Sequence, residues 1–354
     1  MIRVIFTPYA RNPYQSVLKE ELSRLNVRVD FVDFHWLTYS YDVLRNKPNV
    51  LHLHWTYQFV DQKNIFKGII KLFSLLVHIF VIKCRRIAII WTAHNIINHD
   101  SPKPLLDYIC SKLIAKISNA IIVHCPEAKR IMIERFHPSI EGKMSVINHG
   151  NYIGIYENEI DQETCKLFLG IPKCSFVFGF FGNLRPYKNL EGLLEAFNKL
   201  SSEYDDVYLV VAGKPFDMKF AGKLKRWAES NPKVILISEH VPKKFVQVIL
   251  NAADIMVCPF TEILTSGSII LFMSFAKPVI SPKLGCVADV LNGKGGFLYN
   301  LEADHGLLES MRESIRKRDN LKIMGFYNFR KVRKYDWTSI ASKTRYVYEY
   351  VIRL

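Results

Sequence analysis

Short apolar runs alternate with helix-like segments along almost the whole chain, and this alternation most constrains the fold. The stretches IRVIFT (2–7), NVLHLHW (49–55) and NAIIVHC (119–125) have the composition of buried strands. Between them lie segments such as NPYQSVLKEELSRLN (12–26), whose apolar residues recur at helical spacing. Strand–helix alternation is typical of a parallel sheet covered by helices. The sequence therefore predicts an α/β fold with a doubly wound sheet.

The alternation occurs twice, because a second series of strand-like runs begins after residue 151. It includes FVFGFFGNL (176–184), VYLVVAG (207–213) and DIMVCPF (254–260). A chain of 354 residues is long enough for two domains of ordinary size. We predict two Rossmann-like doubly wound domains facing across a cleft, with domains at 1–150 and 151–332. The last stretch, YNFRKVRKYDWTSIASKTRYVYEYVIRL (327–354), is predicted to be one long helix, with 333–354 as the terminal element.

The chain is basic, with 48 Lys and Arg against 33 Asp and Glu, a net charge of +15. Such a balance indicates an anionic partner: phosphorylated substrates, an anionic membrane or nucleic acid. No zinc-finger spacing, aromatic RNA-binding motif or basic tail is present in the sequence. Nucleic acid is therefore not the expected partner.

The segment IFKGIIKLFSLLVHIFVIKCRR (65–86) is strongly apolar and is flanked by Lys and Arg. Its longest run without a cation, 72–82, is about half of a membrane span. Cations at the headgroups and apolar residues between them favour a helix lying in the membrane interface. A buried core helix and a transmembrane span are the alternatives.

Two turns in the second half have residues suited to an anion. In FFGNLRPYKN (180–189), Gly182 lets the backbone approach a ligand, and Arg185 and Lys188 follow just before a helix, as a diphosphate requires. In EILTSGS (262–268), backbone amides and hydroxyls precede another helix. These groups could bind phosphate oxygens or simply cap that helix, and Glu262 could bind sugar hydroxyls or stabilise the helix N-terminus.

The first half offers polar residues just after its predicted strands. His94 and Asp100, in WTAHNIINHD (91–100), could act as a general base or bind a sugar hydroxyl, or His94 could be structural. His52 and His54 share one side of a strand and are interpreted as structural or acceptor-binding, since no third metal ligand is nearby in the sequence. In the first turn, Arg11 and Asn12 could bind an acceptor phosphate or cap a helix. No CxxC motif and no Cys/His spacing typical of a metal site occurs, so no metal is expected.

Several of these stretches together resemble the bacterial nucleotide-sugar glycosyltransferases of the GT-B fold, family-4-like, in the exopolysaccharide and capsule assembly branch. The matching pieces are FGNLRPYKNLEGLLEAF, VYLVVAGKP, VPKKFVQVILNAADIMVCPF, LTSGSIILFMSFAKPVI, the hinge VINHGNY and the N-terminal NPYQ, HLHW and TAHN. The resemblance extends over nearly the whole chain. It implies an N-terminal acceptor-binding domain, a C-terminal nucleotide-sugar-binding domain and a terminal helix that returns to the first domain.

The resemblance also implies roles for individual residues. Arg185 and Lys188 would bind the donor diphosphate, with Gly182 and Asn183 beside them, and His94 would contact the transferred sugar. The nucleotide and the donor sugar would lie against the remaining residues: Gly213, Lys214, Val241, Thr265, Ser266, Gly267 and Ser268. The candidate catalytic residues are His94, Asp100 and Glu262.

The chain differs from the family pattern at three positions. The Arg expected directly after the glycine of the first motif is replaced by Asn183, and two expected glutamates fall on Ile263 and Leu271. Retaining and inverting stereochemistry both stay open, and an inverting enzyme would need His94 or Asp100 as base.

The expected function is transfer of a sugar from a UDP- or GDP-sugar to a lipid-diphosphate-linked saccharide in bacterial surface polysaccharide synthesis. The donor is a substrate, and no cofactor is expected. The enzyme would be cytoplasmic and peripheral on the inner face of the cell membrane, held by anionic lipid. A nucleotide-sugar epimerase on the same fold and a non-catalytic sugar-nucleotide-binding protein are the alternatives.

Overall fold

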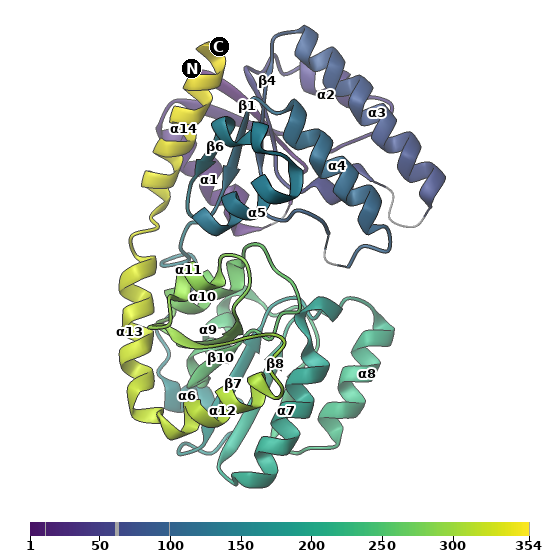
Figure 1. Cartoon of the computed structure of the whole chain (residues 1–354). Coiled ribbons are helices and arrows are strands. Elements are labelled where there is room, and N and C mark those ends of the chain that lie inside the picture. The colour runs from purple at the N-terminus through teal and green to yellow at the C-terminus, as the bar shows by residue number, and fades with distance from the viewer. Residues whose placement is uncertain (11, 61–63, 99, 354) are drawn as a thin grey trace. The chain divides into compact units, whose positions relative to one another are not determined.

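A computed structural model describes residues 1–10, 12–60, 64–98 and 100–353. The chain divides into two compact units (Figure 1). Unit 1 consists of Met1–Gly150 and Tyr335–Leu354, and unit 2 of Asn151–Lys334.

Unit 1 is built on a six-stranded sheet in the order β2-β1-β3-β4-β5-β6, and every neighbouring pair is parallel. Its strands are β1 (Ile2–Thr7), β2 (Val27–Phe31), β3 (Val50–Leu53), β4 (Ala88–Thr92), β5 (Ala120–Val123) and β6 (Met144–Val146). The central strands β3, β4 and β5 are buried at every position, as expected of a sheet covered on both faces.

Helices connect and cover this sheet. They are α1 (Pro13–Arg24), α2 (Tyr39–Leu44), α3 (Ile65–Cys84), α4 (Pro104–Ile117), α5 (Pro126–Phe136) and α14 (Trp337–Arg353), with the short 3-10 turns η1 (Thr56–Phe59) and η2 (Pro138–Lys143). The terminal helix α14 packs against α1, and the Thr338 hydroxyl donates to the Glu21 carboxylate at 3.0 Å. The last residues of the chain thus belong to the first unit.

Unit 2 repeats the design with the strand order β12-β11-β10-β7-β8-β9, again parallel throughout. Its strands are β7 (Phe176–Phe181), β8 (Val207–Ala212), β9 (Val234–Ile237), β10 (Ile255–Val257), β11 (Val279–Pro282) and β12 (Gly296–Tyr299). Strands β7 and β10 are neighbours at the point where the strand order reverses. In folds of this type, ligands bind at the carboxyl ends of the strands beside that point.

The helices of unit 2 are α6 (Gln162–Phe168), α7 (Leu190–Glu203), α8 (Met218–Glu229), α9 (Val246–Ala252), α10 (Gly267–Ser274), α11 (Val287–Leu291), α12 (Gly306–Arg316) and α13 (Leu321–Val332), with η3 (Pro186–Lys188), η4 (Lys243–Phe245) and η5 (Arg318–Asn320). The predicted doubly wound α/β architecture is confirmed in both units. The prediction of one long helix at the end of the chain was wrong, because α13 ends at Val332 and α14 begins at Trp337. Asp336 accounts for the new start, since its carboxylate accepts the Ser339 amide at 2.8 Å.

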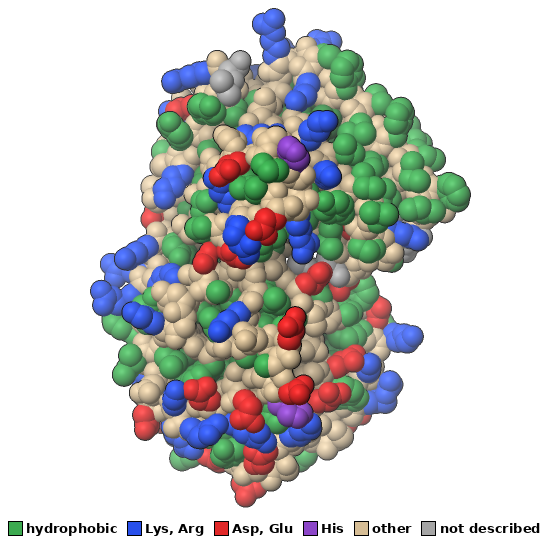
Figure 2. All heavy atoms as spheres, in the orientation of Figure 1, with side chains coloured by type: hydrophobic (Ala, Val, Ile, Leu, Met, Phe, Trp, Pro, Cys, Tyr) green, Lys and Arg blue, Asp and Glu red, His purple; other side chains and the backbone are tan. Residues whose placement is uncertain are grey.

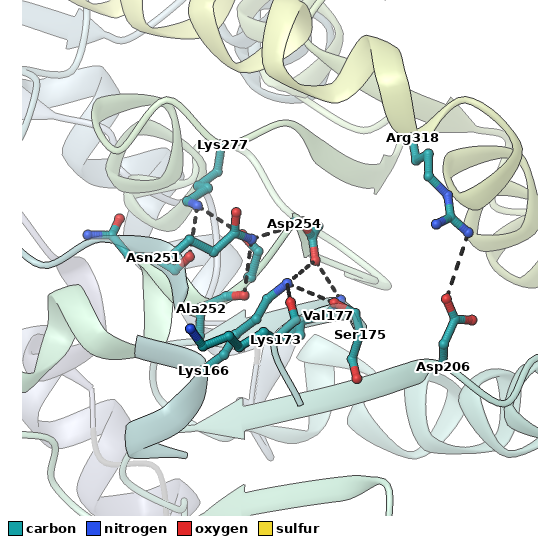
Figure 3. A network of polar contacts seen from close by, with 12 residues as sticks. Lys166, Lys173, Ser175, Val177, Asp206, Asn251, Ala252, Asp254, Lys277 and Arg318 are labelled. Carbon is teal, nitrogen blue, oxygen red and sulfur yellow. Dashed lines mark hydrogen bonds and ion pairs between the residues drawn. The ribbon is translucent and has the colours of Figure 1, made fainter. Parts of the chain in front are cut away.

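Buried and half-buried polar groups bond to one another at the amino edge of the unit 2 sheet (Figure 3). The Lys166 ammonium donates to the Ser175 carbonyl at 2.7 Å and to the Asp254 carboxylate at 3.3 Å, which also accepts the Val177 amide at 2.8 Å. The Lys277 ammonium donates to the Ala253 carbonyl at 2.8 Å, and its burial lowers the pKa of Lys277 to about 8. These bonds join β7, β10 and β11 at the sheet edge opposite to the turns described next.

Candidate functional site

Three elements of unit 2 meet at Gly182, the first residue after β7. A Cβ atom at this position would lie 2.8 Å from the Lys188 Nζ atom and 3.3 Å from the Ser268 Oγ atom. Gly182 has a φ angle of +137°, which other residues rarely adopt. The glycine therefore leaves room between a cation and a hydroxyl that come from separate parts of the sequence.

Lys188 is a buried cation, with only 6% of its surface exposed. Its ammonium lies 5.4 Å from the ring centroid of Phe180 and 6.0 Å from that of Phe260. These rings come from β7 and from the turn after β10, so the ammonium lies at the carboxyl ends of the two central strands. Interaction with aromatic faces stabilises a partly desolvated cation.

The helix α10 begins beside this cation with a polar first turn. Ser266 is its N-cap, and the Ser266 hydroxyl accepts the Ile269 amide at 3.3 Å. Thr265, Gly267 and Ser268 are half-buried around the same turn. The amides at a helix N-terminus favour an anion, and Ser268 is the hydroxyl that lies beside Gly182. Thus Ser266 caps the helix, and the Ser268 hydroxyl points to the space beside Lys188.

The turn after β8 supports the turn after β7 from one side. A Cβ atom on Gly213 would lie 1.9 Å from the Gly182 carbonyl oxygen, and the φ angle of Gly213 is +148°. The Leu184 amide donates to the Lys214 carbonyl at 2.8 Å, which fixes the two turns side by side. On this pair of turns, the Arg185 guanidinium lies 5.3 Å from the Phe216 ring, and the side chains of Asn183 and Lys214 are exposed.

Glu262 and Val241 lie on neighbouring turns of the same edge. Thr261, next to Glu262, donates its amide to the Tyr187 carbonyl at 2.9 Å, which joins the Glu262 segment to the Lys188 turn. Val241 is half-buried in the segment after β9. Of the predicted donor-site residues, Gly182, Gly213, Lys188 and Ser268 are brought into one cluster, and Val241 lies farther along the edge beyond β9.

The two positions where the family pattern has glutamates are not polar in this structure. Leu271 is 5% exposed within the buried part of α10. Ile263 is half-buried, and its carbonyl packs against Gly285. A Cβ atom on Gly285 would lie 2.4 Å from the Ile263 carbonyl oxygen. Apolar side chains thus occupy both positions where the family pattern has a carboxylate.

The carboxyl edge of the unit 1 sheet has a different composition, because four neighbouring strands are each followed by histidine. His54 follows β3, His94 follows β4, His124 follows β5 and His149 follows β6. The ring of Tyr14 lies 4.8 to 5.9 Å from all four histidine rings, and Trp55 stacks on His94 at 4.4 Å. His54, His94 and His124 are buried.

Hydrogen bonds link three of these rings into a chain with a definite direction. His124 Nδ1 lies 2.9 Å from the Ile147 carbonyl oxygen, which can only accept, so this nitrogen donates. His124 Nε2 then accepts from His94 Nδ1 at 3.2 Å, and His94 Nε2 accepts from His54 Nδ1 at 3.2 Å. In the neutral state every ring therefore carries its proton on Nδ1, and both nitrogens of His94 are engaged.

Burial keeps this edge uncharged. It lowers the pKa of His52 to about 3 and that of His124 to about 4. The pKa values of His54 and His94 are held well below the usual range by burial first and by the neighbouring histidines second. Neutral imidazoles can each donate one hydrogen bond and accept another, which is what the chain of histidines requires.

The other candidate residues of unit 1 lie outside the chain of hydrogen-bonded histidines. Asp100 is half-buried in the loop before α4. His52 is structural, because its ring bonds the Tyr348 hydroxyl of α14 and the Thr92 hydroxyl, each at 2.7 Å. Asn12 caps α1, accepting the Gln15 amide at 3.2 Å, and Arg11 lies outside the described residues.

Sequence reasoning missed His124, His149 and Tyr14 as members of the cluster. The signal was the recurrence of histidine after successive strands, in HLHW, TAHN, IVHC and VINHG. Within the described parts of the chain, no group of three or more His, Cys, Asp or Glu side chains is arranged to hold a metal ion. The histidines bond one another instead.

Part of the chain is similar in sequence to known glycosyltransferases. Residues 175–317 match the family model described as "Glycosyl transferases group 1". A GDP-mannose:glycolipid 4-beta-D-mannosyltransferase of Xanthomonas campestris pv. campestris is 25% identical over 139 residues, which cover 38% of this chain and 39% of that protein. A D-inositol 3-phosphate glycosyltransferase of Corynebacterium urealyticum is 23% identical over 254 residues, covering 69% of this chain and 59% of that protein. The matched segments thus span about two fifths to three fifths of the length of these relatives.

Solved structures match over the whole chain. Sucrose-phosphate synthase from Thermosynechococcus elongatus has a TM-score of 0.79 at 12% identity, covering 99% of this chain and 98% of that one. Anabaena HepE in complex with UDP-glucose has a TM-score of 0.77 at 14% identity, with both chains fully covered. The fold is GT-B. The predicted fold is therefore confirmed, and the glycosyltransferase sequence pattern lies in the unit that contains the cationic turn.

Proposed function

We propose that the chain is a hexosyltransferase that takes its sugar from a UDP- or GDP-sugar bound at the carboxyl edge of unit 2. The observation that carries this proposal is the meeting of the Lys188 ammonium and the Ser268 hydroxyl beside Gly182, at the N-terminus of α10. A diphosphate needs a cation, hydrogen-bond donors and an open backbone at one place. The match of residues 175–317 to group 1 glycosyl transferases supports the same reading.

The arrangement suits departure of a nucleoside diphosphate. When the bond between the sugar and the β-phosphate breaks, negative charge develops on the phosphate oxygens. Lys188, held between aromatic rings, and the amides and hydroxyl of the α10 turn are already oriented before the reaction. Preorganised donors of this kind stabilise the transition state more than the ground state. Arg185, on the adjoining turn, would add a second cation.

The acceptor hydroxyl must lose its proton during transfer, and unit 1 offers the candidate groups. Both ring nitrogens of His94 are engaged by other histidines, so His94 neither removes this proton nor bonds a sugar hydroxyl unless one of those hydrogen bonds breaks. Asp100 is the carboxylate we favour as base if the reaction inverts configuration. Glu262 would bind hydroxyls of the donor sugar.

We further propose that the acceptor is a lipid-diphosphate-linked saccharide of a bacterial surface polysaccharide, glycosylated at the cytoplasmic side of the membrane. The Xanthomonas relative is named for transfer of mannose to a glycolipid, which supports an acceptor of this class. The basic charge of the chain is compatible with an acceptor that has a diphosphate.

The test is a nucleotide screen followed by a transfer assay. Calorimetric titration with UDP, GDP and their sugars should show one preferred nucleotide, and mass spectrometry should show hexose added to a short-chain lipid-diphosphate saccharide. Lys188→Met should weaken binding of that nucleotide about a hundredfold, because a charge-assisted contact to phosphate is lost. The matched control is Lys225→Met, a change of a lysine whose side chain is 72% exposed on α8.

The same assay separates the alternatives. An epimerase would change the donor sugar without any acceptor, and a binding protein would retain the nucleotide with no turnover. Either result, or unchanged nucleotide affinity in Lys188→Met, contradicts the proposal.

A further inference from the structure

The helix α3 has two apolar faces, of which one packs against unit 1. Leu72, Leu75, Ile79 and Ile82 recur at intervals of three and four residues and are at most 8% exposed. They form the inner stripe, on a helix that packs against α2, α4 and η1. This face explains how the helix is attached to its unit.

The opposite face of α3 is equally apolar and faces outward. Its members recur with the same spacing and have no charge among them: Phe66, Ile69, Ile70, Phe73, Val77, Phe80 and Val81. Phe66, Phe73 and Phe80 are 74%, 68% and 68% exposed. Figure 2 shows apolar side chains gathered over this part of unit 1. A surface helix of a soluble protein has a polar outer face, so this outer stripe indicates an apolar partner.

Exposed residues on both neighbours of α3 widen the apolar surface. On one side, Trp36, Leu37 and Tyr41 are 42%, 62% and 69% exposed in and before α2. The Trp36 carbonyl bonds His78 Nε2 at 3.0 Å, which fixes this segment beside α3. On the other side, Leu105 of α4 is 71% exposed. Trp and Tyr are the residues enriched where proteins meet the headgroup region of a bilayer.

Cations stand at both ends of the outer stripe. Lys67 is exposed in the first turn of α3, and Lys83, Arg85 and Arg86 are exposed at its end. The latter three line a cavity of about 750 Å³ together with Arg353 of α14. An apolar strip with cations at its ends is complementary to acyl chains bordered by anionic headgroups.

We propose that unit 1 docks on an anionic lipid bilayer through this surface, with α3 lying flat in the interface. The outer stripe from Phe66 to Phe80 would enter one leaflet along about 20 Å of helix. By length and composition α3 could also cross a bilayer. A crossing helix would have to leave α2 and α4 and expose Leu75 and Ile82, now fully buried, so the flat orientation agrees with the packing. The proposal goes beyond sugar transfer and does not depend on it.

The test is sedimentation of the full chain with vesicles of phosphatidylcholine, with or without phosphatidylglycerol, in the absence of donor and acceptor. Wild type should bind the anionic vesicles strongly and release from them at high salt. The triple variant Phe66→Ser, Phe73→Ser, Phe80→Ser should bind on the order of a hundredfold more weakly. The matched control, Phe168→Ser, Ile323→Ser, Phe326→Ser, changes residues of unit 2 that are 60% to 69% exposed and should bind like wild type.

A second readout does not require loss of binding. A Phe73→Trp variant should show blue-shifted fluorescence with anionic vesicles, quenched by lipids brominated on their acyl chains, whereas Phe326→Trp should show neither effect. Neutralising Lys67, Lys83, Arg85 and Arg86 with Gln should reduce binding to the level seen on phosphatidylcholine alone.

Three outcomes would overturn the proposal. The triple variant could bind vesicles like wild type. The bound protein could resist extraction by alkaline carbonate, which would show that α3 crosses the bilayer. The free chain could be a dimer that the triple variant dissociates while vesicle binding is unchanged, which would show that a second copy covers the stripe.

Discussion

The carboxyl edges of the two sheets have the same architecture and opposite chemistry. In unit 1 the turns after β3, β4, β5 and β6 each present a histidine, and the three buried rings at their centre bond one another. In unit 2 the turns after β7 and β8 begin with glycines of positive φ, and a buried lysine lies beside the first. A parallel sheet thus provides only the edge, and the residues of the turns decide which ligand it suits.

The two edges differ in charge, because the histidines of unit 1 are neutral and Lys188 of unit 2 is a cation. Packing the imidazoles together away from water removes their charge, which leaves neutral donors and acceptors that bond one another. The unit 2 edge combines a cation on aromatic faces with a helix N-terminus, which suits phosphate. We therefore expect acid to destabilise unit 1, and a side chain added to a glycine of the turns to disrupt the edge of unit 2.

Acid should produce the largest effect, and it should act on unit 1. The folded-state pKa values of His52 and His124, about 3 and 4, lie below the ordinary value near 6.5, so the unfolded chain binds more protons in between. The contribution of these neutral histidines to the free energy of unfolding is therefore fully present above about pH 7, and it is lost as the pH drops from 6.5 toward 4. From pH 7 to 5 each of these histidines costs about 2 kcal/mol of unfolding free energy.

Urea denaturation at pH 7, 6 and 5 measures this loss, and limited proteolysis shows which unit opens first. A His52→Asn variant should have a shallower pH slope, by about 1.4 kcal/mol per pH unit at most. Preferential cleavage within unit 2 at pH 5 would contradict the assignment of the acid-sensitive groups to unit 1.

Gly213→Ala should give the next largest effect, this time at the unit 2 edge. The new Cβ would lie 1.9 Å from the Gly182 carbonyl oxygen, so the two turns must separate. We expect a loss of about 3 kcal/mol in unfolding free energy and loss of nucleotide binding. The control Gly170→Ala has a φ of +69° with nothing within 4 Å of the new Cβ, and it should cost only about 1 kcal/mol. Equal losses in the two variants would show that the contact between the turns is unimportant.

The smallest effects should come from two serines of the same turn, one of which affects stability and the other nucleotide binding. Ser266→Ala removes the N-cap of α10 and should lower the unfolding free energy by about 1 kcal/mol. Ser268→Ala removes the hydroxyl beside Gly182 and should weaken nucleotide binding roughly tenfold with little change in stability. Thermal unfolding and calorimetric titration of both variants measure this, and the reverse pattern would exchange the two roles.

Local signals were sufficient to predict most of the strands and helices, but not how side chains from distant turns meet. Gly182, Lys188 and Ser268 were each identified from the turn that contains them. That the lysine is buried between Phe180 and Phe260 depends on the packing of β7 against β10, which no local pattern contains. The histidine cluster was missed although each histidine follows a predicted strand, because the meeting of these rings at one edge is a property of the assembled sheet. The break before α14 was readable, since Asp336 stands where an N-cap is expected.

The polar network at the amino edge of unit 2 determines where this unit could be cut from the chain. The family match begins at residue 175, but Lys166 and Gln162 bond Asp254, and Cys165 packs on Val248 and Ala252. A recombinant fragment that began at the family boundary would lose the helix that closes the sheet edge. At the other limit, the Asn151 amide group donates to the Val332 carbonyl at 3.3 Å, so the first and last residues of the unit lie together. Both ends of unit 2 thus lie at the same place. Residues 151–334 are therefore the fragment of this unit to express alone.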